Sequence, residues 1–427
     1  MTDLQKNLIA GEWLAGESEI ENRNPSDLSD LVGMFAQASA DQLEATLDQA
    51  QVAQREWAAY GLERKQAVLM NIGNELLARA EELGTLLSRE EGKPLAEGKG
   101  EVYRAGQFFT YYAAECLRQI GENADSVRPD IEVDVRREAV GVVAIISPWN
   151  FPTATASWKI APALCYGNAV VWKPANITPA SAVALTEIIA RQDIPKGLFS
   201  LVMGSGRSIG QRLVESPKVN AISFTGSVPV GKGIAAAAIQ NLTKVQMEMG
   251  SKNALAVMDD ADLDLAVSLA LGGAFGGTGQ KCTASSRLVV HAAVHDAFVE
   301  KLVAGAQAMK VGHALDAGVQ MGPVVSEQQL TENGTLLIKF WLHVSRERQN
   351  LQLREEAPLK MQNPRVPADP DKWWDKYPKA LEISAQLITA TDSSHSPWHL
   401  IEANNPNYRD ITVAQIIVDA MTGLLLV

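Results

Sequence analysis

The chain has 427 residues, a formal net charge of −12, 46% hydrophobic residues and 21% charged residues. This composition predicts a globular protein with room for two or three domains. The negative charge argues against nucleic acid and anionic membranes as partners, because both attract basic surfaces. The three cysteines are too scattered for a disulfide framework or a zinc site, so we expect a reducing cytoplasm and no metal.

The N-terminal part of the chain predicts short strands followed by helices. Turn signals before residue 35 indicate strands, with a hairpin over residues 8–13. From residue 40 to about residue 121, apolar residues recur at helical spacing. Residues 131–136 alternate between apolar and charged side chains, which predicts a strand with one face in water, inside a strand arm over residues 122–140.

A different pattern begins at residue 142. Short apolar strands alternate with helices, which is typical of βαβ units around a parallel sheet and predicts a Rossmann-like α/β fold. The expected strands cover residues 142–146, 169–172, 199–202, 221–224 and 244–247, and the helices between them cover residues 156–164, 179–191, 209–215 and 230–239.

Polar or glycine-rich residues follow four of these strands. Parallel sheets bind ligands at the carboxyl ends of their strands, so we predict a nucleotide site there. The residues at these ends are Ser147-Pro148-Trp149-Asn150, Lys173-Pro174-Ala175-Asn176, Gly204-Ser205-Gly206 and Thr225-Gly226-Ser227.

Two glycine motifs at these ends are weak when taken alone. Residues 204–210 are one residue longer than the dinucleotide fingerprint. Residues 226–233 match the first part of a phosphate-binding P-loop that includes Lys232. Gly233 then stands where a serine or threonine would hold magnesium, so the second motif is more simply a chance match.

Glu248 and Cys282 are the strongest candidates for covalent chemistry at a carbonyl group. Glu248 lies in an apolar run, and a buried carboxylate is costly unless it is paired or its pKa rises, which suits a general base. Cys282 follows a glycine-rich loop and Lys281, whose cation favours the nucleophilic thiolate. All six histidines follow Cys282, so the carboxylate is the better candidate base. A paired or half-exposed glutamate and a buried cysteine with a packing role are the structural alternatives.

Several motifs in one order resemble the NAD(P)-dependent aldehyde dehydrogenases over residues 6–332. Residues 247–253 and 280–287 are most similar to the 2-oxoglutaric semialdehyde (2,5-dioxopentanoate) dehydrogenases of that family. The motifs are Ser147-Pro148-Trp149-Asn150-Phe151-Pro152, Trp172-Lys173-Pro174-Ala175, Phe224-Thr225-Gly226-Ser227, Glu248-Met249-Gly250 and Gly279-Gln280-Lys281-Cys282.

The resemblance implies a role for each matching residue. Cys282 would attack the aldehyde carbon, Asn150 and the Cys282 N–H would stabilise the oxyanion, and Glu248 would activate water for thioester hydrolysis. NAD or NADP is the implied cofactor, and an aldehyde, such as a semialdehyde, is the implied substrate. Cys116 and Cys165 match no catalytic motif. The implied cofactor-binding residues are Ile146, Trp149, Lys173, Asn176, Gly206, Gly210, Gly226, Ser227 and Gly250.

Two finer expectations concern specificity. Asn176 stands where NAD-preferring members of the family often carry a glutamate that binds both ribose hydroxyls. A neutral residue removes repulsion against a 2′-phosphate, so we expect NADP to be accepted and to be the favoured cofactor. Arg287 and Lys159 are candidates for contact with an acidic aldehyde, and surface or structural roles are the alternative.

The resemblance ends near residues 332–333. Family members continue with a Glu-x-Phe-Gly-Pro motif and an oligomerisation strand, and this sequence shows neither, which argues against the homo-oligomer of the family. We therefore expect an NAD(P)-binding domain over residues 1–247, a partial catalytic domain over residues 248–332 and a foreign α/β tail over residues 333–427.

The tail resembles a C-terminal fragment of the second-family polyphosphate kinases over residues 334–421. The phosphate loop and magnesium aspartates of that family have no counterpart here. Three hypotheses follow: an aldehyde dehydrogenase with an interrupted catalytic domain, a fusion product that only binds nucleotide, and, least favoured, a phosphotransferase that uses Lys232. The matching pieces are residues 335–345, 358–360, 373–377, 396–398 and 401–404.

Overall fold

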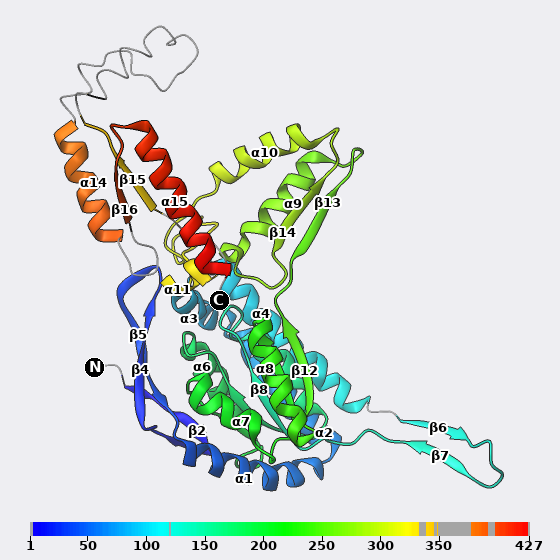
Figure 1. Ribbon diagram of the computed structural model, residues 1–427. Helices are drawn as coiled ribbons and strands as arrows, with labels where there is room; N and C mark the ends of the chain where they lie inside the picture. Colours follow the sequence, from blue (N-terminus) through cyan, green and yellow to red (C-terminus); the bar gives the residue numbers. More distant parts are fainter. Residues whose placement is uncertain are drawn as a thin grey trace. The chain divides into compact units, whose positions relative to one another are not determined.

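The computed structural model describes residues 3–118, 121–332, 339–345, 348, 377–391 and 398–425 (Figure 1). The chain divides into two compact units, Met1–Val325 and Ser326–Val427. The first unit holds every residue for which the sequence predicts a catalytic or cofactor-binding role.

A seven-stranded sheet forms the centre of the first unit, with the strand order β12-β11-β8-β9-β10-β2-β3. Neighbouring strands from β12 to β10 run parallel, and β2 pairs antiparallel with both β10 and β3. The predicted Rossmann-like α/β fold is therefore confirmed, and the hairpin over residues 8–13 is present. The strands are β2 (Asn7–Ile9), β3 (Glu12–Leu14), β8 (Val142–Ile146), β9 (Ala169–Lys173), β10 (Phe199–Leu201), β11 (Ala221–Gly226) and β12 (Lys244–Met249).

The chain builds this sheet outward from β8 in both directions. It passes from β8 through β9 to β10, and then returns to the other side of β8 to add β11 and β12. The strand order therefore reverses between β8 and β11, and such a point is where open α/β sheets bind ligands. The connecting helices are α5 (Ala154–Cys165), α6 (Pro179–Ala190), η1 (Gly206–Gly210) with α7 (Gln211–Glu215), and α8 (Val228–Ala238) with η2 (Ile239–Asn241).

Four helices precede the parallel strands, as the helical spacing predicts. Ser39 and Gln42 form a capping box at the first of them, which satisfies backbone donors that a helix start leaves free. The indole N–H of the buried Trp57 donates to the carbonyl oxygen of Leu164 at 2.8 Å, so α1 is tied to α5. The fourth helix packs against α2, α3 and α5. The helices are α1 (Ala40–Ala58), α2 (Leu62–Ala78), α3 (Ala80–Glu91) and α4 (Leu95–Leu117).

Two smaller groups of strands lie outside the central sheet. The strands β1 (Leu4–Gln5), β5 (Asp27–Gln37) and β4 (Ser18–Asn24) form one sheet. The strands β6 (Glu122–Asp125) and β7 (Glu132–Val135) pair only with each other among the described strands. The prediction that residues 131–136 have one buried face is wrong, because Val133 and Val135 are 44% and 49% exposed.

The residues after β12 form a small lobe around a two-stranded parallel sheet. Its core consists of Val257, Val267, Ala270 and Phe298. Leu265 and Leu269 on the same lobe are each 57% exposed, because two strands cover little of a helix. The elements are β13 (Asn253–Val257), α9 (Leu263–Phe275), η3 (Gly276–Gly279), β14 (Ser285–Val290) and α10 (His295–Ala308).

The second unit contains a parallel pair of strands, β15 (Lys339–His343) and β16 (Trp398–Glu402). Its described helices are α11 (Glu327–Glu332), α14 (Tyr377–Thr391) and α15 (Pro406–Leu425). Of the tail pieces that carry the second resemblance, residues 335–338, 358–360, 373–376 and 396–397 lie outside the described residues. Within the described ranges, no helix combines the length and apolar character that a membrane span needs.

Candidate active site

The three predicted catalytic residues come from three separate segments of the first unit. Asn150 is half-buried in the turn between β8 and α5. Glu248 lies in β12, paired in register with Thr225 of β11. Cys282 is exposed in the turn that connects η3 to β14.

Two side-chain amides fix the backbone of the turn that carries Cys282. The Nδ2 atom of Asn150 donates to the carbonyl oxygen of Gln280 at 2.8 Å. The Nδ2 atom of Asn253 donates to the carbonyl oxygen of Cys282 itself, also at 2.8 Å. The structure therefore ties the predicted oxyanion donor to the turn that carries the predicted nucleophile.

Lys281, which the sequence places beside the thiol, has an acidic partner. Its ammonium group lies 2.8 Å from a carboxylate oxygen of Glu97 on α4, so the positive charge is shared with that carboxylate. The other oxygen of Glu97 accepts the Gly277 N–H at 3.0 Å. Gly277 has a φ of +57°, a left-handed conformation that favours glycine.

The surroundings of Glu248 differ from the sequence expectation. Glu248 is exposed, so the prediction of a buried carboxylate in an apolar run is wrong. The reason is the position of β12, which is an edge strand of the sheet and pairs only with β11 among the described strands. The Nε2 atom of Gln246 donates to Glu248 at 3.2 Å. Water can therefore reach the carboxylate, which a base that activates water requires.

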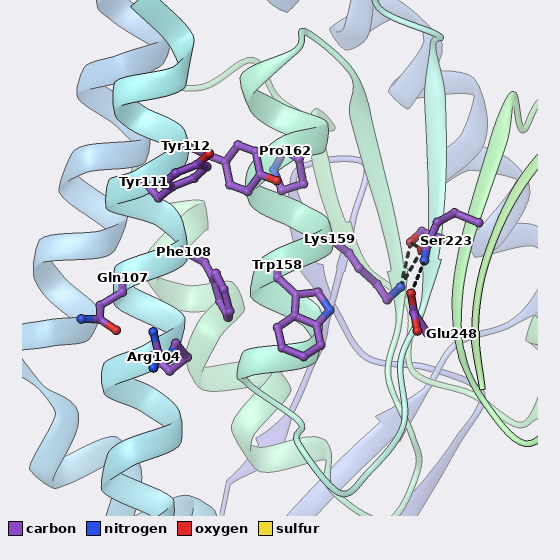
Figure 2. A pocket seen from close by; sticks show the side chains of 11 residues that line it. Arg104, Gln107, Phe108, Tyr111, Tyr112, Trp158, Lys159, Pro162, Ser223 and Glu248 are labelled. Carbon is purple, nitrogen blue, oxygen red and sulfur yellow. Dashed lines mark hydrogen bonds between the residues drawn. The ribbon is translucent and has the colours of Figure 1, made fainter. Parts of the chain in front are cut away.

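A cavity of about 760 Å³ lies beside Glu248, between α4, α5 and the strands β11 and β12 (Figure 2). The Nζ atom of Lys159 donates to Ser223 Oγ and Gln246 Oε1, at 2.9 Å in each case. Burial lowers the pKa of Lys159 to about 8, and the negative charge of Glu248 opposes part of that change. The aromatic side chains that line the cavity are Phe108, Tyr111, Tyr112 and Trp158.

The buried ammonium of Lys159 predicts a measurable pH dependence of stability. The unfolded chain keeps this proton up to its ordinary pKa of 10.5, whereas the folded chain releases it near pH 8. The free energy of unfolding should therefore rise between pH 8 and pH 10.5, by at most about 3 kcal/mol from this group. Urea unfolding across this range should show a smaller rise for Lys159→Met. The control Lys232→Met, at an exposed position, should show the same pH dependence of the free energy of unfolding as the native chain. The same pH dependence in Lys159→Met would contradict the prediction.

The residues predicted to bind a cofactor lie along one edge of the sheet, at the carboxyl ends of its parallel strands. Two pairs flank the point where the strand order reverses: Ile146 and Trp149 at the end of β8, and Gly226 and Ser227 at the end of β11. The others are Lys173 at the end of β9 with Asn176 after it, Gly206 and Gly210 at the two ends of η1, and Gly250 after β12.

Comparison with known proteins decides the family. The profile of the aldehyde dehydrogenase family matches residues 13–338. An alpha-ketoglutaric semialdehyde dehydrogenase of Bacillus subtilis is 41% identical over 327 residues, which cover 76% of this chain and 67% of that enzyme. The chain belongs to the aldehyde dehydrogenase family. The predicted family is confirmed, and the chain spans about two thirds of the length of this relative.

Other aldehyde dehydrogenases agree with this assignment. The NADP-dependent succinate-semialdehyde dehydrogenase of Escherichia coli is 38% identical over 330 residues, covering 77% of this chain and 68% of that enzyme. A solved aldehyde dehydrogenase of Brucella melitensis biovar abortus has a TM-score of 0.76 at 33% identity, over 78% of this chain and 69% of that one. A betaine aldehyde dehydrogenase of Staphylococcus aureus, solved with NAD+, has a TM-score of 0.74 at 33% identity, over 76% and 65% of the two chains.

A second family profile matches the end of this aldehyde dehydrogenase chain. The polyphosphate kinase 2 family matches residues 296–424, which overlap the end of the first match. The resemblance of the tail to that family is therefore confirmed. The P-loop-like segment lies far upstream of this match, and its Lys232 is exposed on α8.

The sheet edge that carries the predicted cofactor-binding residues has polar atoms without hydrogen-bond partners in the described part of the chain. Within the described residues, the buried Oδ1 of Asn176 and the buried Oγ1 of Thr225 have no hydrogen-bond partner. Burial lowers the pKa of Lys173 to about 8, and its Nζ donates to the carbonyl oxygen of Pro174 at 3.0 Å, which leaves donors to spare. Unpaired polar atoms at strand ends suit a ligand with hydroxyl and phosphate groups, so these residues fit a nicotinamide dinucleotide.

Three residues of this site escape the sequence reasoning. Glu97, and Arg104 in the lining of the cavity beside Glu248, lie on α4, where charged residues at helical spacing are typical of a solvated face. Asn253 lies in a motif that the resemblance includes, but without a role. Cys116 and Cys165 are buried, and the Sγ atom of Cys116 lies 4.0 Å from the carbonyl oxygen of Cys165, in agreement with their expected packing role.

Proposed function

We propose that this chain oxidises an aldehyde to a carboxylate with NAD(P), through a covalent intermediate on Cys282. The observation that carries the proposal is the 2.8 Å hydrogen bond from Asn150 Nδ2 to Gln280 O. It brings a neutral amide donor to the backbone of Gln280, two positions before Cys282 in the sequence, and this contact supports a role for Asn150 in stabilising the oxyanion. Formation of reduced cofactor from an aldehyde by the native chain, and its loss in Cys282→Ser, tests the proposal.

The first chemical step uses Cys282 and Asn150. The thiolate attacks the aldehyde carbon, a C–S bond forms, and the carbonyl oxygen becomes an oxyanion. The Nδ2 group of Asn150 has a second N–H that donates to that oxygen while the first keeps its bond to Gln280, and the N–H of Cys282 supplies another donor. Such donors typically contribute roughly 3–4 kcal/mol each to stabilisation of the transition state. A nicotinamide dinucleotide held at the carboxyl ends of the strands by residues such as Lys173, Asn176 and Ser227 would supply the acceptor for the hydride of the same carbon, and this oxidation would leave a thioester on Cys282.

The second step uses Glu248. Its exposed carboxylate accepts a proton from water, the water oxygen attacks the thioester, and the C–S bond breaks to release the acid and the Cys282 thiolate. Glu248 then gives its proton to the solvent, which restores the carboxylate. Lys159 lies close enough for its charge to interact with Glu248, and it is anchored by Ser223 and Gln246.

We also propose NADP as the favoured cofactor. Asn176 offers an uncharged amide at the end of β9, and its Nδ2 donates to Gln37 Oε1 at 3.1 Å while its Oδ1 has no partner among the described residues. A neutral side chain there does not repel a 2′-phosphate. A steady-state preference for NAD would contradict this proposal.

The proposed substrate is an acidic semialdehyde such as 2-oxoglutaric semialdehyde. The relatives at 41% and 38% identity are dehydrogenases of alpha-ketoglutaric and succinate semialdehydes. The cavity beside Glu248 carries Arg104 and Gln107 on α4, and Figure 2 shows Trp158 between these two and the group of Lys159, Ser223 and Glu248. Arg104 has no ion pair among the described residues, so its guanidinium can receive a distal carboxylate in a bidentate manner.

Arg104→Gln should raise KM for 2-oxoglutaric semialdehyde by about ten- to hundredfold, because a hydrogen bond to a charged group is lost. KM for a neutral aliphatic aldehyde should stay unchanged, and kcat should change little for either substrate. The matched control is Arg118→Gln at the end of the same helix, where the guanidinium pairs with Glu115 outside the cavity. An equal rise in KM for the acidic and the neutral aldehyde would exclude Arg104 as the carboxylate partner.

We propose that residues 1–247 form the NAD(P)-binding domain, residues 248–332 a partial catalytic domain and residues 333–427 the polyphosphate-kinase-like part. The overlap of the two family matches and the division of the structure at Val325 support a junction in this region. A cytoplasmic location is proposed because the three cysteines are few and scattered in the sequence. The oligomeric state stays a prediction.

A further inference from the structure

Helix α4 contacts both loops that carry the proposed oxyanion donor and nucleophile. Its residues Glu97 and Glu101 are four apart, so they project from one face of the helix. Glu101 is buried and reaches the loop that contains Asn150, whereas Glu97 is half-buried and reaches the turn that leads to Cys282.

The contacts of Glu101 fix the oxyanion loop at both ends. Its Oε1 accepts the N–H groups of Thr153 and Ala154 at 2.9 Å and 3.0 Å, where α5 begins. Its Oε2 lies 2.7 Å from the buried Nζ of Lys93, which also donates to the carbonyl oxygen of Asn150 at 2.6 Å. One buried ion pair therefore holds both Asn150 and the start of α5 against α4.

The contacts of Glu97 bracket the nucleophile turn in the same manner. One oxygen accepts the Gly277 N–H at 3.0 Å and the other pairs with Lys281 at 2.8 Å, so both ends of the segment before Cys282 are held. This segment needs external support. Gly277, Thr278 and Gly279 have φ values of +57°, +60° and +69°, and a left-handed conformation is strained at the threonine.

We propose that Glu97 is a positioning residue that holds the Cys282 turn in register with the Asn150 loop. This proposal rests on the proposed function for its catalytic meaning, but the structural effect is independent of turnover. Glu97 and Glu101 act as two fixed points on one rigid helix, and the bond from Asn150 to Gln280 spans the gap between the loops they hold. Misplacement of reacting groups by about 1 Å can cost about a hundredfold in rate.

Amide hydrogen exchange of the full chain, followed over residues 276–284, tests the proposal together with steady-state kinetics. Glu97→Ala should raise exchange there by about ten- to hundredfold, because a charge-assisted hydrogen bond is lost. Exchange in α1 to α3 and the thermal midpoint should remain native. The value of kcat should fall by about tenfold or more, with KM for the aldehyde unchanged. Glu97→Gln retains an acceptor for the Gly277 N–H and should restore most of the protection.

The matched control is Glu81→Gln. This change removes a carboxylate of α3 that pairs with Lys99 on α4 and contacts neither loop. This variant should be native in exchange and in kinetics. Two results for Glu97→Ala would overturn the positioning role. One is a native exchange rate over residues 276–284, and the other is an equal rise in the exchange rate throughout the chain. If the native chain shows no turnover, the proposed oxidation fails, while the exchange experiment still decides whether Glu97 holds the turn.

Discussion

Replacing Cys282 by serine should reduce the formation of reduced cofactor from an aldehyde by about 10⁴-fold or more. A hydroxyl is a far weaker nucleophile than a thiolate, and in the described part of the chain none of the contacts that hold this turn comes from an imidazole that could activate it. Cys282 is exposed and its turn is held through the backbone, so the fold and dinucleotide binding should be unaffected. The measurement is the absorbance of the reduced cofactor with 2-oxoglutaric semialdehyde, beside dinucleotide binding by calorimetry.

The matched control is Cys165→Ala, which removes a buried thiol that has no role in the proposed chemistry. It should retain turnover, provided that circular dichroism shows that the variant is folded. Native turnover in Cys282→Ser would exclude a covalent mechanism on this residue. A soluble and folded native chain without turnover would show that the part of the family beyond this match is indispensable, and that the chain is an aldehyde dehydrogenase by descent that only binds nucleotide.

Glu248→Gln should separate the two halves of the reaction. The hydride step should remain, whereas hydrolysis of the thioester should slow by about 10²- to 10⁴-fold, because an amide cannot accept a proton from water. The expected result is a burst of about one equivalent of reduced cofactor per chain, followed by a slow steady state. Intact-mass spectrometry should then detect the acyl group on Cys282.

Two outcomes would contradict this role for Glu248. One is steady-state turnover at the native rate with no preceding burst, which would assign hydrolysis to another base. The other is loss of the burst itself, which would place Glu248 in the first step. Glu132→Gln in the exposed strand β7 is the control for removal of one surface carboxylate, and it should behave as the native chain does.

The parallel arrangement of the central strands and the edge that carries the predicted site follow from the sequence. Val142–Ile146 and Ala169–Lys173 are continuous apolar runs that end in polar residues, and short apolar strands separated by helices have few alternatives to a parallel sheet. Predicted boundaries fall within a few residues of the observed ones. Local chain properties suffice here, because strand and helix periodicity are set by neighbours in the sequence.

The tertiary structure alone decided how the site is held together and how exposed it is. Glu97 meets Gly277 across 180 residues of sequence, and Asn150 meets Gln280 across 130, so no local pattern could have paired them. Glu248 is exposed because β12 ends up at the edge of the sheet, which depends on strand order rather than on its own apolar neighbours. Residue types and spacing determined which side chains can react, whereas long-range packing determined which ones meet, because contacts distant in sequence form only when the whole sheet and α4 are assembled.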